Sequence, residues 1–83
     1  MGEQTVTVRG VRQLDHDPAA LRWARKQAGQ TQAWLAAELG ISPGHMSEIE
    51  SGKRNATPAN IRKIAKLLGC PRSVIEAKQP VAA

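Results

Sequence analysis

The chain is short and basic. It has 83 residues, with 12 Lys and Arg against 7 Asp and Glu and a formal net charge of +5. This length fits one domain near the lower limit for a core without disulfides, and the charge favours a polyanionic partner. Cys70 is the only cysteine and neither histidine has a neighbour at a catalytic or metal-binding spacing, so we expect no enzyme, no metal and no cofactor. No apolar run approaches the roughly 20 residues that span a bilayer, which predicts a cytoplasmic protein without a membrane partner.

Residues 1–17 differ from the rest of the chain. Thr5-Val6-Thr7-Val8 alternates with a period of two, and the acidic Asp15-His16-Asp17 follows. A single strand has no partner in an otherwise helical chain, so three interpretations stay open: a disordered arm, a strand that pairs across a dimer, or a basic arm in a DNA minor groove. We assign residues 1–17 to an arm, 18–77 to one domain and 78–83 to a tail.

A first helix is predicted to begin at Asp17-Pro18, as N-cap and first helical residue, and to end near Gly29. One face of this helix collects residues at helical spacing: Leu21, Ala24, Arg25 and Ala28. Both tryptophans, Trp23 and Trp34, are expected to pack at the edge of the core. Trp34 alternatively contributes to a partner surface, because an indole combines a large apolar area with a polar group.

Two short helices around a glycine turn are predicted over residues 31–54. Thr31 is an N-cap and Gly40 ends the first of them, while Ser42-Pro43 starts the second and Ser51-Gly52 closes it. The apolar residues of both helices recur at helical spacing, and Ile41 in the turn is expected to enter the core. These inward positions are Leu35, Ala36, Leu39, Met46 and Ile49.

Two further helices complete the chain. Thr57-Pro58 starts one that runs to Gly69, with inward positions Ile61, Ile64, Ala65 and Leu68. Pro71 opens a last short helix, whose Val74 and Ile75 either complete the core or form a dimer contact. Cys70 is expected at the edge of the core.

The order and spacing of the residues from about 18 to 75 resemble the XRE-type helix-turn-helix domain of Cro and phage repressors. Gln32 begins the first motif helix, Gly40 is at the turn, and Ile49-Glu50-Ser51-Gly52-Lys53-Arg54 matches the ending of the motif. The resemblance implies an all-α, compact five-helix, lambda-repressor-like domain. It also implies a partly buried ion pair between Arg25 and Glu50, which would mainly fix the orientation of their helices.

The resemblance further implies how the residues would meet DNA. The second motif helix would enter the major groove, with His45 facing guanine or a phosphate and Glu48 either accepting from cytosine, holding a neighbouring cation or repelling wrong sequences. The positions facing the bases would be Pro43, Gly44, His45, Ser47 and Glu48. The positions contacting the DNA backbone would be Thr31, Gln32, Lys53, Arg54 and Asn55.

The implied function is a transcription regulator of double-stranded DNA, located with the nucleoid. A repressor that binds paired operator half-sites as a homodimer is the expected form. The alternative is an antitoxin or another interaction module with the same fold, whose arm or last helix binds a partner protein.

Overall fold

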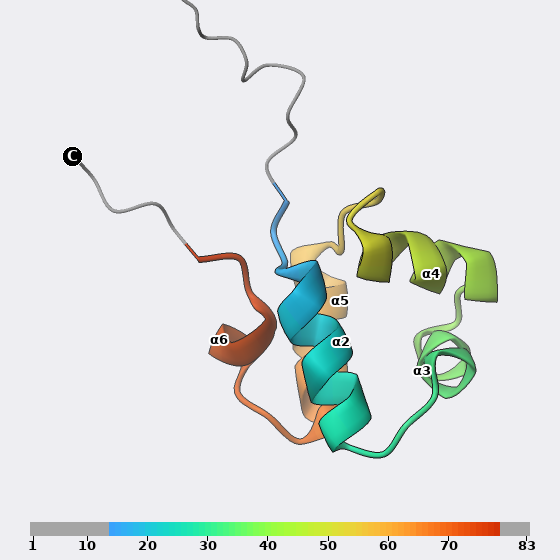
Figure 1. The fold of residues 1–83 in the computed structure, drawn as a ribbon, viewed down its shortest axis with the longest axis horizontal. Coiled ribbons are helices and arrows are strands. Elements are labelled where there is room, and N and C mark those ends of the chain that lie inside the picture. Colours follow the sequence, from blue (N-terminus) through green and yellow to red (C-terminus); the bar gives the residue numbers. More distant parts are fainter. Residues whose placement is uncertain (1–13, 79–83) are drawn as a thin grey trace, which may run out of the picture.

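Five helices make up residues 14–78, the part of the chain that the computed structural model describes. They are α2 (Pro18–Gln27), α3 (Gln32–Leu39), α4 (Pro43–Ser51), α5 (Pro58–Leu68) and α6 (Arg72–Ile75), as Figure 1 shows. The only strand-like feature among these residues is an isolated antiparallel bridge between His16 and Glu76. The predicted all-α, five-helix architecture is confirmed. None of the helices in this part of the chain has the length and apolarity required to cross a bilayer.

The ends of the helices follow from capping chemistry. Four N-cap side chains accept hydrogen bonds from backbone N–H groups of the first turn, and a proline opens three of these four helices. Gly40 ends α3 with φ +71° and Gly52 ends α4 with φ +88°, a left-handed conformation that costs other residues more than it costs glycine. The four capping residues are those predicted from the sequence: Asp17, Thr31, Ser42 and Thr57.

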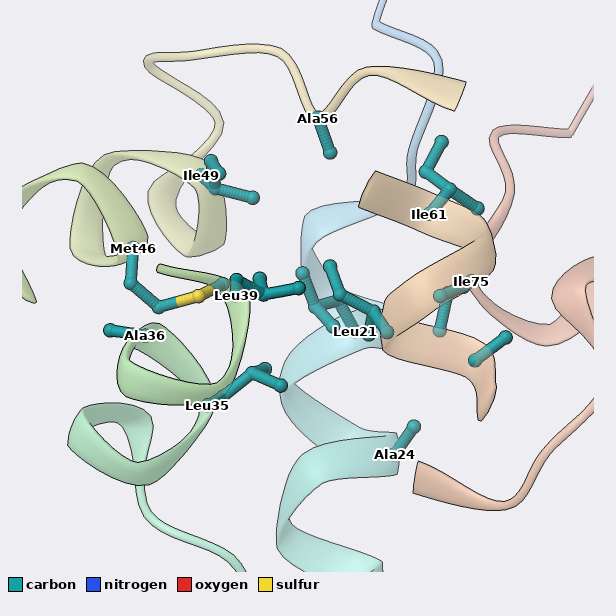
Figure 2. Packing of buried hydrophobic residues seen from close by; sticks show 12 residues of the cluster. Leu21, Ala24, Leu35, Ala36, Leu39, Met46, Ile49, Ala56, Ile61 and Ile75 are labelled. Carbon is teal, nitrogen blue, oxygen red and sulfur yellow. The ribbon is translucent and has the colours of Figure 1, made fainter. Parts of the chain in front are cut away.

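The core lies where α2, α3, α4 and α5 meet. Leu21 of α2 is fully buried at its centre, and Met46 extends from α4 toward Leu39 of α3 (Figure 2). α3 packs against α4, α2 packs against both α4 and α6, and α5 packs against α3 and α6. Ile75 of α6 is buried and Val74 is partly buried, so this short helix completes the core. Ile41, Trp34 and Cys70 pack against the core from its edge.

Two side chains predicted for α2 lie elsewhere. Ala28 was predicted on the buried face, but α2 ends at Gln27, so Ala28 is its exposed C-cap. Trp23 was predicted at the edge of the core, but its side chain is 59% exposed. A helix turns about 100° per residue, so Trp23, two positions after the central Leu21, points to the opposite side of α2.

Residues 14–17, which were predicted to belong to the arm, pack on the domain. The Asp17 N–H donates to the Ile75 carbonyl and the Ala77 N–H donates to the Asp15 carbonyl, both at 2.9 Å. His16 is 2% exposed. The domain therefore extends on the N-terminal side at least to residue 14. The alternating Thr5–Val8 segment and residues 79–83 of the predicted tail lie outside the described residues.

Candidate nucleic-acid interface

The outer surface of α4 carries the residues that were predicted to face bases. Met46 and Ile49 are fully buried and hold the helix on the core. The remaining faces are polar or small: Pro43, Gly44 and Ser47 are exposed, and His45 and Glu48 are partly exposed. A Cβ atom added at Gly44 would meet nothing within 4 Å, so the first turn of α4 is open to a close approach.

Glu48 holds Arg54 of the following loop. Glu48 Oε1 lies 2.8 Å from both Nε and Nη2 of Arg54, and both side chains are about half exposed, at 45% and 52%. An exposed pair of this kind contributes little to stability, so Arg54 can exchange the carboxylate for a phosphate at small cost. The contact matches the alternative in which Glu48 holds a neighbouring cation.

Glu50 and Arg25 form the ion pair that the resemblance implied. Arg25 Nε lies 2.6 Å from Glu50 Oε2, and Arg25 Nη2 donates to Glu50 Oε1 at 3.0 Å. Glu50 is 2% exposed, and Arg22 donates to its backbone carbonyl. The hydrogen bond to Glu50 raises the pKa of Arg25, so this guanidinium stays charged. The pair joins α2 to the end of α4.

Gln32 is also bound to this ion pair. Its side-chain Nε2 donates to Glu50 Oε1 at 3.1 Å. An amide carries two N–H donors, so one hydrogen can hold Glu50 while the other serves the phosphate contact predicted for this position. Thr31, predicted beside it, is exposed, and its hydroxyl oxygen accepts from the Trp34 N–H.

Asn55, predicted to contact the DNA backbone, has its side chain bound within the protein. Asn55 Nδ2 donates to Asp15 Oδ2 at 2.7 Å, and Asn55 Oδ1 accepts the Asp15 N–H at 2.7 Å. The two residues are 40 positions apart, and no periodic pattern connects them. The exposed cations of the same loop, Lys53 and Arg54, directly precede Asn55 in the chain.

His16, which was not among the predicted site residues, is buried beneath this loop. Its Nδ1 accepts the Ala56 N–H at 3.2 Å, and its Nε2 lies 2.7 Å from the Ile49 carbonyl oxygen. Because Nδ1 accepts, the ring hydrogen is on Nε2 and donates to Ile49. A neutral imidazole thus bridges the end of α4 and the end of the loop.

Neither a metal centre nor a reactive thiol emerges from residues 14–78. No group of three or more His, Cys, Asp or Glu side chains in this range is arranged to hold a metal ion. Cys70 is partly buried, and burial raises the pKa of its thiol, which lowers the fraction of reactive thiolate.

Comparisons with known proteins agree with this geometry. Two solved structures have a TM-score of 0.63 to this chain. The clp gene regulator ClgR from C. glutamicum is 32% identical, with 68% of this chain and 73% of that chain covered. The restriction-modification controller protein C.AhdI from Aeromonas hydrophila is 30% identical, with 69% and 86% covered.

A third solved structure, of a protein from Bacteroides fragilis, has a TM-score of 0.67, with 77% of this chain and 97% of that chain covered. At 22% sequence identity, this similarity supports the fold alone. No curated protein matches the chain. The helix-turn-helix family model matches residues 21–75, which is well over half of the chain. The chain therefore belongs to the XRE-type helix-turn-helix family of DNA-binding transcription regulators.

Proposed function

We propose that this protein is a repressor that binds operator half-sites as a homodimer, with α4 in the major groove of each half-site. Occupancy of a promoter would exclude polymerase, and paired recognition helices about 34 Å apart would read one face of the duplex. Pro43, Gly44, His45, Ser47 and Glu48 would face the bases. The backbone contacts would come from Thr31, Gln32, Lys53, Arg54 and Asn55.

The observation that carries this proposal is the position of α4 and the loop that follows it. Met46 and Ile49 bury one side of α4, while its first turn and polar side face outward, and Lys53 and Arg54 lie exposed directly after the helix. Backbone contacts from such cations set affinity and register, whereas contacts from the helix set sequence preference. The named regulators ClgR and C.AhdI support regulation of genes as the purpose of this binding.

The test is selection of bound sites from random duplex DNA at two salt concentrations. We expect a two-fold symmetric site whose halves are about 10 base pairs apart, since a dimer imposes its symmetry on the operator. Variants at His45 or Glu48 should change the preferred sequence. An asymmetric site bound by one protomer would contradict the dimer, and absence of any enriched site would contradict sequence-specific regulation.

Replacing Arg54 tests the backbone contact. Arg54→Ala should weaken binding to every duplex and reduce the slope of log K against log salt by about 0.9, the contribution of one neutralised phosphate. Lys66→Ala removes the same charge from α5 and should leave the slope closer to that of the wild type. Equal slopes for Arg54→Ala and the wild type would show that Arg54 does not contact phosphate.

A protein-interaction function, such as that of an antitoxin, is the second candidate. The exposed indole of Trp23 on α2 favours it, because tryptophan is enriched where proteins meet. A Trp23→Ala variant that keeps DNA binding but loses a co-purifying protein would support this function. If the selection gave no enriched site and the wild type captured a defined partner protein, the protein-interaction function would replace the repressor proposal.

A further inference from the structure

We infer that residues 14–17 form a clamp that fixes the loop of residues 53–56 in the conformation that binds DNA, with Asp15 as its main positioning residue. This inference rests on the proposed function, because it assigns a role in DNA binding to residues that lie before the matched segment of residues 21–75. Asp15 itself carries the wrong charge for a phosphate contact, so its contribution would act through Asn55.

The first contact of the clamp is reciprocal. Asn55 Nδ2 donates to the Asp15 carboxylate and Asn55 Oδ1 accepts the Asp15 backbone N–H, each at 2.7 Å. Two hydrogen bonds through one amide fix both the position and the orientation of Asn55. Since Asn55 directly follows Arg54, this contact also restricts the backbone that carries the two loop cations.

The second contact holds both ends of the loop. His16 binds the Ile49 carbonyl near the end of α4 and the Ala56 N–H at the end of the loop, at 2.7 and 3.2 Å. The imidazole is 2% exposed, so water does not replace these partners readily. The distance between α4 and the start of α5 is therefore set by a side chain from outside both elements.

The clamp also covers the turn between α4 and the loop. A Cβ atom placed on Gly52 would lie 3.4 Å from Pro18 Cγ and 3.8 Å from Leu14 Cδ1, so the residues on either side of Asp15–Asp17 leave little room for a side chain at this turn. Two backbone hydrogen bonds join the clamp to the end of α6 and the residues that follow it. The Ala77 N–H donates to the Asp15 carbonyl, and the Asp17 N–H donates to the Ile75 carbonyl.

Such a clamp would raise DNA affinity by preorganisation. A loop that is already ordered loses less conformational freedom when its cations meet phosphates. Removing the clamp should therefore reduce affinity without removing a phosphate contact, so the salt dependence should not change. An unchanged salt dependence distinguishes loss of the clamp from Arg54→Ala, which removes a phosphate contact and flattens the salt dependence.

A matched pair of variants at Asp15 separates the hydrogen bond from the charge. Asp15→Asn and Asp15→Ala both remove one negative charge, but only the asparagine keeps an oxygen that accepts from Asn55. Charge alone would raise the affinity of both variants equally. With the clamp, we expect Asp15→Ala to bind the selected duplex about tenfold more weakly than Asp15→Asn, with the same salt slope. Exchange of the Ala56 amide hydrogen should be faster in Asp15→Ala than in Asp15→Asn.

Asn55 provides a second test of the same clamp. If Asp15 and Asn55 act through their shared hydrogen bonds, the losses of affinity in Asp15→Ala and Asn55→Ala should be less than additive in the double variant Asp15→Ala/Asn55→Ala; fully additive losses would show that the two residues act independently and would overturn the clamp. Equal affinities of Asp15→Ala and Asp15→Asn in a protein that binds DNA would overturn the clamp alone. A wild type that binds no duplex would overturn the proposed function, and this role with it.

Discussion

Glu50 shows how a single charged residue can organise the domain. Its carboxylate is almost completely removed from water, which is costly unless hydrogen bonds replace the lost solvation. Arg25 donates to both of its oxygens and Gln32 to one of them, so α2, α3 and α4 all contribute to this one site. The hydrogen bonds of this ion pair therefore form only when the three helices are correctly placed relative to one another.

Replacing one partner should therefore be more damaging than replacing both. We expect Arg25→Met to lower the free energy of unfolding by about 3–5 kcal/mol, because the Glu50 carboxylate remains buried without its cation. In the double variant Arg25→Met/Glu50→Met a large part of this loss should be recovered. Urea denaturation measures both. A double variant as unstable as Arg25→Met would show that packing, and not the unpaired charge, causes the loss.

Individual residues of the site differ in how far the sequence predicts them. The Arg25–Glu50 pair was predictable, because both residues occupy positions of a recognised motif. The Asp15–Asn55 contact and the buried His16 were not, because their partners are 33 to 40 positions distant and belong to no periodic pattern. Side chains that bridge segments outside the motif become visible only when the chain is folded.

Helix boundaries, at the scale of elements, were predicted closely because local chemistry determines them. Each of the four longer helices has a capping side chain directly before its first residue, and α3, α4 and α5 end at a left-handed glycine. The errors arose in α2, where the position of its last turn and the 100° turn per residue decide which side chains face the core. Ala28 lies beyond the last turn of α2, and Trp23 lies on its outer face.

Capping should matter for α4, a short helix of nine residues. The Ser42 hydroxyl accepts from the His45 N–H at 3.0 Å, and Ser42→Ala should reduce the free energy of unfolding by about 1 kcal/mol. Ser42→Thr keeps the accepting oxygen and serves as the control. Thermal or urea denaturation without DNA gives the comparison. If the alanine and threonine variants were equally stable, packing on Met46 and Ile49 alone would hold the first turn.

At the scale of the whole molecule, the two ends of the described chain meet. His16 pairs with Glu76 in an antiparallel bridge, and backbone hydrogen bonds join Asp15 to Ala77 and Asp17 to Ile75. Both residues of this bridge lie outside the matched segment, which begins at residue 21 and ends at residue 75. The family model thus covers most of the helical part of the chain, while Asp15, His16, Glu76 and Ala77 lie just outside the matched segment.

A comparison of two shortened chains tests whether this closure stabilises the domain. A chain of residues 17–78 keeps the Asp17 cap of α2 but loses the His16 hydrogen bonds, the Asp15–Asn55 contact and the bond from Ala77 to Asp15. At about 1 kcal/mol for each of these five hydrogen bonds, and less for the two exposed ones of Asn55, it should unfold with about 3–5 kcal/mol less free energy than a chain of residues 14–78. Urea denaturation followed by helical circular dichroism measures the difference. Equal stability of the two chains would mean that the helices alone hold the fold, and that residues 14–16 contribute only to the placement of the loop.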